Sequence, residues 1–426
     1  MKSNKTGKGT TAMDQQFYIE NRRALSALLE EDTCIAAVST GYPVCRSADE
    51  NYPFQPNTNA LYLLGISQAF VHYVLIKDGG RAEEFLFIDE YDAFYEKWIG
   101  HRLTADEAAA LCGIPADHIL HTAQFEDFLA EKAAHYRTVY LDLESQEQFG
   151  YATFGLYLSG LLDRVKDVDK KDLYPLLCRL RSVKKPCEIE AIRRAIAVTR
   201  LGVLSLMDHA APGMYEYQLE AWFDHVIKDN GNRKFSFPTI AASGINATTI
   251  HYMQNNSLIR DGDLLLFDLG CRDEEYCADI SRTFPANGKF TDLQKTIYEI
   301  VLHANKTIAA EAKAGMTLRQ LQIRCTELLA DGCLAAGLIQ KKEEISRYYV
   351  HGVSHPIGLD CHDPALRSEP LPVGAVISDE PGLYFPEYAI GVRIEDDLLL
   401  EEDGAVNLSA DIPKEIDEIE AYMKNR

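Results

Sequence analysis

Carboxylates and histidines gather in the second half of this 426-residue chain, where several of them end short apolar segments. Asp268 closes the apolar run LLLFDLG, and Asp279 follows eleven residues later in CADISRTF. Two strands joined by the polar turn CRDEEY would place these carboxylates side by side across a hairpin. An aspartate at a strand end is usually a turn or cap residue, so its chemistry depends on the groups that accompany it.

Three of the twelve histidines lie within residues 351–363, in the segment HGVSHPIGLDCHD. The spacing of His351 and His355 would suit a zinc site on a helix, but two glycines and a proline argue against a helix here. In an extended segment alternate residues share one face, so these two histidines can still converge. His362 follows after a short turn. Packing alone is a poor explanation for three histidines in so short a segment.

Two further carboxylates follow at the ends of apolar segments. Glu380 comes after GAVIS and before Pro-Gly, with Asp379 beside it. The segment GVRIEDD alternates, which places Arg393 and Glu395 on one face; such a pair is often only a surface ion pair. His251, in TTIHY, could by itself be an ordinary core histidine.

Together these residues form a suitable cage for two divalent cations, with four carboxylates and one imidazole: Asp268, Asp279, Glu380, Glu395 and His355. Four negative charges match two M²⁺ ions, and the oxygen-rich set favours Mn²⁺, Mg²⁺ or Co²⁺ over a thiolate zinc site. A shared water would then ionise near neutral pH. The remaining histidines could donate hydrogen bonds to an oxyanion.

The composition narrows the possible partners. The chain has 43 basic and 65 acidic side chains and a net charge of −22, which argues against nucleic-acid and membrane partners. Ten cysteines without a C-x-x-C pair indicate reduced thiols and a cytoplasmic protein. Residues 1–14 are basic and rich in glycine and threonine, without the apolar segment of a secretory signal, and are expected to be a disordered tail.

The pattern of elements predicts two domains. In the first, an α/β domain, helices are expected over residues 17–30, 104–112 and 125–134, and strands over residues 33–39, 71–77, 84–89 and 138–143. A basic stretch, LRSVKKP, marks the boundary. In the second, helices are expected from about 186, 215, 291 and 317, with strands over residues 263–270, 275–284, 348–355 and 390–400. Helix pairs around hairpin strands indicate an α+β domain.

The ordered motifs LLLFDLG, ADISRTFP, HGVSHPIGLDCHD, DEPGLY and GVRIEDD resemble those of the metal-dependent pita-bread peptidases of family M24, and most closely the aminopeptidase P group. RSADENYPFQPNTNALYLLGI and EKWIGHRL in the first domain resemble the N-terminal domain of the same group. The resemblance runs from about residue 18 to 421. It implies an N-terminal creatinase-like α/β domain over residues 15–178 and a catalytic pita-bread domain over residues 179–426.

The resemblance also implies roles for single residues. The metal ligands would be Asp268, Asp279, His355, Glu380 and Glu395, with Mn²⁺ as the usual ion and Co²⁺ or Zn²⁺ possible. Glu380 would transfer protons, and His251, His351, His362 and Arg393 would surround the substrate. Family members are commonly dimers or tetramers. The sequence departs from the family where Ser378 and Asp379 precede Glu380, and the role of Asp379 is left open.

The expected activity is hydrolysis of the bond between an N-terminal residue and a following proline in peptides. A prolidase, which cuts only dipeptides, is the nearest alternative because it uses the same site. A non-catalytic peptide-binding module is a more remote one, since such modules tend to lose ligands. Amidinohydrolases without metals are disfavoured by the complete ligand set, and methionine aminopeptidases by the presence of the first domain.

Overall fold

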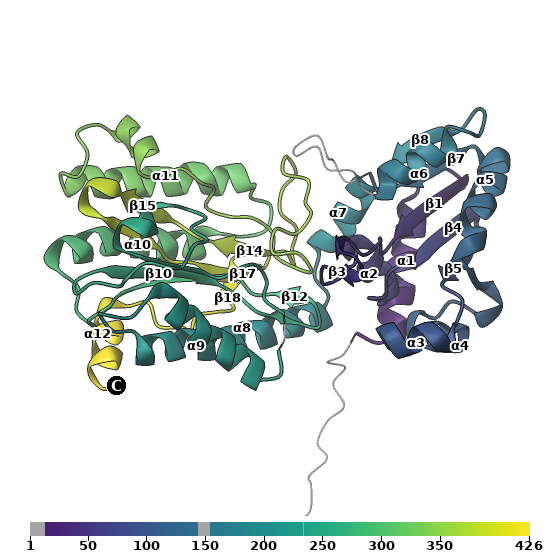
Figure 1. Ribbon diagram of the computed structural model, residues 1–426. Coiled ribbons are helices and arrows are strands. Elements are labelled where there is room, and N and C mark those ends of the chain that lie inside the picture. Colours follow the sequence, from purple (N-terminus) through teal and green to yellow (C-terminus); the bar gives the residue numbers. More distant parts are fainter. Residues whose placement is uncertain (1–12, 144–153, 233) are drawn as a thin grey trace, which may run out of the picture. The chain divides into compact units, whose positions relative to one another are not determined.

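The computed structural model describes residues 13–143, 154–232 and 234–426, which form two compact units. One unit ends at Leu180 and the other begins at Arg181 (Figure 1). The expected tail, residues 1–14, lies outside the described residues except for its last two. Asp14 caps the first helix, because its side chain accepts a hydrogen bond from the backbone N–H of Phe17.

The first unit is built on a six-stranded mixed sheet in the order β6-β5-β4-β1-β7-β8. Its strands are β1 (Thr33–Ser39), β4 (His72–Asp78), β5 (Arg81–Ile88), β6 (Ile119–His121), β7 (Thr138–Leu141) and β8 (Asp169–Asp172). Gly79 and Gly80, both with positive φ, form the two-residue turn between β4 and β5. A short hairpin, β2 (Cys45–Ser47) and β3 (Glu50–Asn51), stands apart from this sheet.

Helices cover the sheet and complete the core of this unit. They are α1 (Gln15–Leu28), α2 (Thr58–Leu64), α3 (Ala93–Ile99), α4 (Ala105–Cys112), α5 (Phe125–Tyr136), α6 (Phe154–Leu162) and α7 (Tyr174–Ser182), whose last two residues belong to the second unit. Leu129 of α5 and Leu158 of α6 pack in one buried cluster with Ile35 and Val74 of the sheet. Helix α3 is different, because none of its residues is buried.

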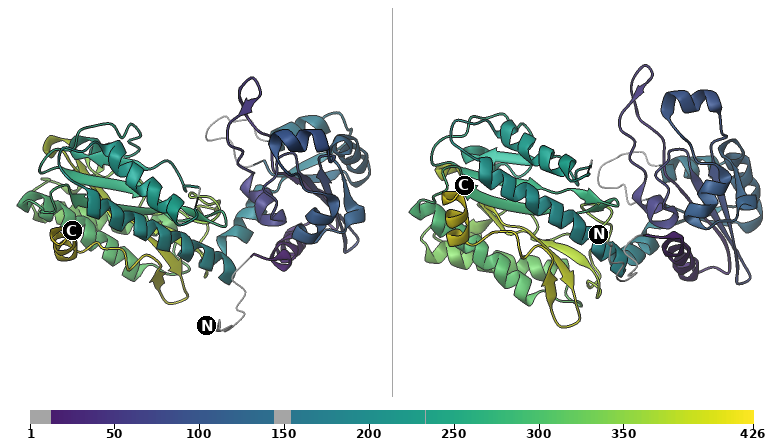
Figure 2. Two further views of the ribbon diagram at one scale, coloured as in Figure 1. Left: turned by 60° about the horizontal axis from the view of Figure 1, so that its bottom comes forward. Right: turned by 90° about the horizontal axis from the view of Figure 1, so that it is seen from below.

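The second unit places its strands between two helix pairs. One pair is α8 (Pro186–His209) and α9 (Glu216–Asp229), and the other is α10 (Asp292–Glu311) and α11 (Leu318–Ala335). Figure 1 shows the pairs on opposite sides of the strands, and the views in Figure 2 bring α8 and α9 forward. Both α10 and α11 begin with a capping box, which explains why the sequence predicts their starts closely. Helix α12 (Ile416–Lys424) follows near the C-terminus.

The strands of the second unit form short antiparallel sheets. Strand β10 (Leu264–Leu269) lies between β9 (Ile240–Ser243) and β13 (Ile280–Pro285). A second sheet contains β14 (Val376–Asp379), β17 (Asp396–Leu400) and β18 (Ala405–Asn407). The described residues also form two strand pairs: β11 (Arg272–Asp273) with β12 (Tyr276–Cys277), and β15 (Gly382–Phe385) with β16 (Ile390–Arg393).

Three strand predictions were wrong in extent, each at a candidate site residue. The strand expected over residues 390–400 divides before Glu395 into β16 and β17, which belong to different sheets. The strand expected over residues 275–284 is interrupted, because β12 ends at Cys277 and β13 begins only after Asp279, at Ile280. Residues 348–355 form no named strand, although His355 accepts a backbone hydrogen bond from Ser378 of β14 at 2.9 Å. The regular ladders therefore end where these candidate residues stand.

None of the described helices is long and apolar enough to cross a lipid bilayer.

Candidate metal centre

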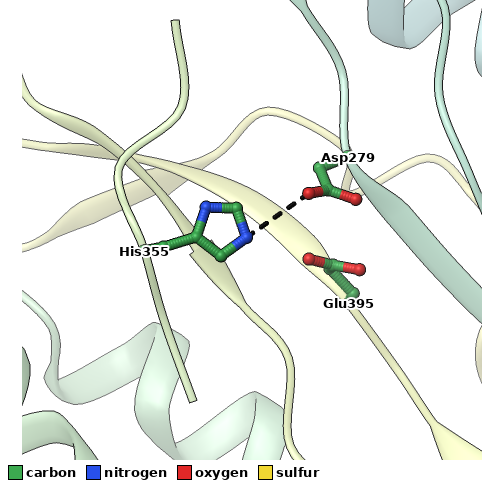
Figure 3. Close-up of side chains that lie close together, drawn as sticks. All are labelled: Asp279, His355 and Glu395. Carbon is green, nitrogen blue, oxygen red and sulfur yellow. Dashed lines mark ion pairs between the residues drawn. The ribbon is translucent and has the colours of Figure 1, made fainter. Parts of the chain in front are cut away.

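Three predicted ligands converge from three different segments of the chain. One ligand atom each of Asp279, His355 and Glu395 lies within 4.8 Å of those of the other two. Asp279 directly precedes β13, Glu395 stands between β16 and β17, and His355 lies in the loop beside β14. Figure 3 shows the His355 ring directed at Asp279, with the carboxylate of Glu395 beside both.

The ring of His355 is oriented by its backbone neighbour. Its Nδ1 lies 3.0 Å from the carbonyl oxygen of Pro356, which can only accept a hydrogen bond, so Nδ1 carries a proton. The other nitrogen, Nε2, lies 3.4 Å from Oδ2 of Asp279 and 3.4 Å from Oε1 of Glu380. In the neutral ring this nitrogen directs its lone pair at the carboxylates. That arrangement is typical of a histidine that binds a metal.

Asp268 stands on β10, where it pairs across the ladder with Ser281 rather than with Asp279. Its Oδ2 accepts a hydrogen bond from Nη2 of Arg393 at 2.6 Å. Its Oδ1 is buried and has no hydrogen-bond partner within the described part of the chain. A buried carboxylate oxygen without a donor is the kind of atom that a cation satisfies.

The electrostatics of these groups also fit cations. Burial raises the pKa of Asp268 to about 6 against the opposing effect of Arg393, and it raises the pKa of Glu380 to about 7. Burial and the neighbouring carboxylates raise the pKa of Glu395 well above its usual range. Burial opposes protonation of His355, but Asp279 and Glu380 outweigh it and raise its pKa to about 9. The cluster therefore retains protons that divalent cations would displace.

A hydrogen-bonded chain leads away from Asp268 through Arg393 and Tyr384 to His351. Arg393 donates from Nη1 to the Tyr384 hydroxyl oxygen at 2.9 Å, and that hydroxyl lies 2.8 Å from Nε2 of His351. Nδ1 of His351 donates to the carbonyl of Gly352 at 2.8 Å, so Nε2 accepts the tyrosine proton. Burial and then Arg393 lower the pKa of His351 to about 4, which keeps this ring neutral.

The other two predicted histidines stand at the exposed side of the site. The His362 ring stacks on that of His355, with ring centres 3.9 Å apart. Partial burial of the His362 ring, and after it the charge of the stacked His355 ring, lower the pKa of His362 to about 4. His251 is exposed, in the loop after β9, and its charge contributes to the lowered pKa values of both His351 and His362. All the predicted site residues therefore belong to one neighbourhood of the second unit.

Two residues that contact this neighbourhood were not predicted. Tyr384 joins Arg393 to His351, and its only signal in the sequence is its place in the DEPGLY motif. Cys361 donates from Sγ to Oδ2 of Asp279 at 2.8 Å. Burial and the charge of Asp279 raise the pKa of this thiol well above its usual range, so it remains protonated.

Asp379, whose role the sequence left open, is directed at helix α10. Its Oδ2 accepts a hydrogen bond from Nδ2 of Asn305 at 3.2 Å. Across the ladder it pairs with Asp396, which binds Arg282 at 2.7 Å and also Lys414. Burial and the charge of Asp396 raise the pKa of Asp379 well above its usual range. Asp379 therefore contacts a buried polar network behind Glu380.

The family of the chain follows from comparison with known proteins. Residues 190–402 match the family model of metallopeptidase family M24, and residues 18–140 match that of the aminopeptidase P N-terminal domain. The chain belongs to metallopeptidase family M24. The Xaa-Pro aminopeptidase of Escherichia coli is 32% identical to this M24 member over 96% of this chain and 98% of its own length.

Solved structures of other M24 members have the same architecture. A Bacillus anthracis structure, provisionally assigned as an aminopeptidase P, is 42% identical and aligns with a TM-score of 0.93 over 97% of this chain and 99% of its own. Two E. coli aminopeptidase P structures, one with the inhibitor Pro-Leu and one Zn-substituted with product, align with a TM-score of 0.89. Each is 32% identical over 97% of this chain and 98% of its own. The N-terminal aminopeptidase P domain and the C-terminal pita-bread domain of this chain match theirs.

Proposed function

We propose that this M24 member is a metalloaminopeptidase that releases the first residue of peptides with proline in the second position. The observation that carries the proposal is the convergence of Asp279, His355 and Glu395, with one ligand atom of each within 4.8 Å of the others. Similarity to the Xaa-Pro aminopeptidase of E. coli over nearly the whole chain supports it.

The proposed site holds two divalent cations, most suitably Mn²⁺, with Co²⁺ or Zn²⁺ as other candidates. Its ligands would be Asp268, Asp279, His355, Glu380 and Glu395. The orphaned Oδ1 of Asp268 and the raised pKa values of the carboxyl groups support a site for more than one positive charge. When bound, divalent cations supply Lewis-acid polarisation of the scissile carbonyl and acidification of the attacking water.

Glu380 is the proposed proton carrier. The bond before proline is a tertiary amide without an N–H, so the departing nitrogen needs a proton from the enzyme. Burial raises the pKa of Glu380 to about 7, so this side chain can accept a proton and return it near neutral pH. Ser378 donates to its Oε1 at 3.2 Å and holds the carboxylate in place.

Three histidines would contact the substrate, and one arginine would hold the groups around it. His251 is the proposed donor to the oxyanion, with His351 and His362 around the peptide. Arg393 would orient Asp268 through the 2.6 Å hydrogen bond and His351 through Tyr384. These assignments give each group a distinct task around one reacting bond.

A substrate comparison tests the function. The metal-loaded protein is incubated with the tripeptide Arg-Pro-Pro, with Arg-Ala-Pro as the matched control, and with the dipeptide Ala-Pro. We expect the first residue to be released from Arg-Pro-Pro and not from Arg-Ala-Pro. Turnover of Ala-Pro alone would favour the prolidase alternative. If metal binds and no peptide is cleaved, the non-catalytic peptide-binding module is favoured.

We also propose a homodimer or homotetramer, with α3 as a contact surface. Its four large apolar side chains are all exposed, with Trp98 at 71% and the others being Phe94, Tyr95 and Ile99. Exposed apolar side chains clustered in this way often mark protein interfaces. Light scattering should give a dimer or tetramer, and Trp98→Glu should reduce its mass; a monomeric wild-type protein would contradict the proposal.

All ten cysteines are free thiols. A reducing compartment, the cytoplasm, therefore remains the predicted location.

A further inference from the structure

We infer that Glu216 is a positioning residue for His251, and that it acts by fixing the loop of residues 244–257, here called the His251 loop. The inference rests on the proposed function, because it takes His251 as a residue that contacts the substrate. Glu216 itself is the first residue of α9, is only 1% exposed, and has no assigned part in the chemistry.

The carboxylate of Glu216 accepts five hydrogen bonds. Oε1 accepts from the backbone N–H of Ser243 at 2.7 Å, from the Ser243 hydroxyl at 2.7 Å and from Nδ2 of Asn246 at 3.0 Å. Oε2 accepts from the hydroxyl of Tyr252 at 2.9 Å and from the backbone N–H of Ser257 at 2.9 Å. Both oxygens are therefore satisfied by groups on or next to the His251 loop.

These five donors span the whole loop. Ser243 directly precedes it at the end of β9, Asn246 stands near its start, Tyr252 is the immediate neighbour of His251, and Ser257 stands at its end. Asn246 adds bonds of 3.1 Å to the Tyr252 hydroxyl and 2.8 Å to the Ser257 hydroxyl. One buried carboxylate thus joins both ends of the loop to the residue beside the histidine.

A second carboxylate on the same face of α9 also holds the His251 loop; Glu216 and Glu220 together are here called the anchor of this loop. Glu220, one turn further along the helix, accepts from Nδ2 of Asn255 at 2.9 Å. Asn255 has a positive φ of 44°, and its Nδ2 also donates to the carbonyl of Thr239 at 2.8 Å. Because the ring of His251 is exposed, its position follows from the loop backbone that these two glutamates hold.

The chemistry of the anchor requires a carboxylate in particular. Each of the five hydrogen-bond partners of Glu216 donates to it, and two of these donors are backbone N–H groups, which cannot accept a hydrogen bond instead. In Glu216→Gln, one of the two carboxylate oxygens becomes an amide nitrogen. If it replaces Oε1 it faces the N–H of Ser243, and if it replaces Oε2 it faces the N–H of Ser257, so two donors meet in either case. The negative charge also suits the first turn of α9, where the helix dipole is positive.

A double-mutant cycle on the full-length, metal-loaded protein tests the inference. Glu216→Gln, His251→Ala and the double variant are compared by kcat and KM on Arg-Pro-Pro and by metal content. We expect Glu216→Gln to retain its metal and KM and to lose about 10–100-fold in kcat, the size of effect that misplacement of a catalytic group produces. In the double variant, the loss caused by His251→Ala should largely disappear. Full additivity, or a wild-type kcat in Glu216→Gln, would overturn the inference.

Two further variants make the result specific. Asp224→Asn makes the same carboxylate-to-amide change on α9 at a residue that pairs with Lys228 at 2.9 Å, and it should leave kcat unchanged. If Glu216→Gln does not fold, Tyr252→Phe removes a single donor to Oε2 and should lower kcat in the same direction by a smaller factor. Wild-type kcat in Tyr252→Phe would then overturn the inference.

A readout independent of activity separates failure of the inference from failure of the proposed function. The rate at which diethyl pyrocarbonate modifies His251, followed by mass spectrometry, should rise in Glu216→Gln and stay unchanged in Asp224→Asn. If the wild-type protein cleaves no peptide but the modification rate rises, the proposed function fails while the anchor stands. If the rate is unchanged, Glu216 does not hold the loop.

Discussion

Arg393 and Asp268 form a largely buried ion pair in which Nη2 donates to Oδ2 at 2.6 Å. The pair leaves Oδ1 of Asp268 without a hydrogen-bond partner among the described residues, so the arginine engages one oxygen and frees the other. Arg393 also donates from Nε to the Ser281 hydroxyl at 2.8 Å and from Nη1 to Tyr384. One guanidinium therefore connects a proposed metal ligand with the proposed substrate groups.

Arg393→Met should cost about 3–5 kcal/mol of unfolding free energy, because it leaves a largely buried carboxylate without its cation. It should also reduce the metal content, because Asp268 loses the hydrogen bond that orients it as a ligand. Denaturant unfolding and elemental analysis would measure the two effects. Arg324→Met is the matched control, since Arg324 pairs with Glu311 on an exposed surface and should contribute at most about 1 kcal/mol. Equal losses of unfolding free energy in the two variants would show that the Arg393–Asp268 pair stabilises the protein no more than an exposed ion pair.

Metal binding should release protons and weaken as the pH falls. In the metal-free protein the pKa values of Asp268 and Glu380 are raised to about 6 and about 7, and that of His355 to about 9. Cations must displace these protons, so the affinity for Mn²⁺ should be lower near pH 6 than near pH 8, by a factor of about ten or more. Calorimetry in buffers of different ionisation enthalpy measures the proton release. Binding without proton release would contradict the electrostatics of the site.

The same groups predict that the metal-free protein loses stability as the pH rises. Carboxyl groups whose pKa is raised on folding retain protons that the unfolded chain loses above about pH 4, so their ionisation opposes folding up to about pH 7. The proton on His355 stabilises the folded state below its unfolded pKa, and this contribution disappears as the pH rises through about 9. The metal-dependent increase in Tm should therefore grow with pH. A constant increase across this range would refute the prediction.

Loss of a ligand and loss of a substrate donor should be separable. Asp279→Ala and Glu395→Ala should abolish activity together with bound metal. His362→Ala should retain metal and lose roughly 10²–10⁴-fold in rate, as expected for a positioned donor. Kinetics combined with elemental analysis of all three variants makes the comparison. A metal-free His362→Ala would place this histidine among the ligands.

Asp379→Asn should preserve or increase stability near neutral pH. Burial and Asp396 raise the pKa of Asp379 well above its usual range, so its ionised form opposes folding above the unfolded pKa. The amide has the same shape as the protonated acid and can keep the 3.2 Å bond to Asn305. Thermal unfolding over a range of pH would show a flatter profile. A large loss of stability would mean that Asp379 is needed as a charge.

Regular elements were predictable from local sequence because local physics determines them. The apolar run TCIAAVS is predicted and observed as a strand, Thr33–Ser39, and the capping pair Thr291 and Gln294 marks the start of α10. The division of residues 390–400 was not predictable, because the alternation continues through it. The backbone N–H of Glu395 instead bonds the carbonyl of Ser281 at 3.0 Å, a partner far away in the sequence.

The composition of the site was predictable in part for the same reason. Acids and histidines at the ends of apolar segments are visible in the sequence, and so is their order along the chain. The contacts of Tyr384 and Cys361 are not, because each depends on loops brought together by the folded unit. Glu216 is the clearest case: its position at the start of a helix is ordinary, and only the fold brings five donors to it.

The proposed peptidase site requires divalent cations, and titration of the metal-stripped protein is a direct test of this requirement. Mn²⁺ is added back while release of arginine from Arg-Pro-Pro is followed, with Glu395→Ala as the control. We expect no activity without metal and a rise that levels off at two equivalents of Mn²⁺. Activity that persists in the stripped protein, or a metal-bound protein that releases no arginine, would show that the site is not a metal-dependent aminopeptidase.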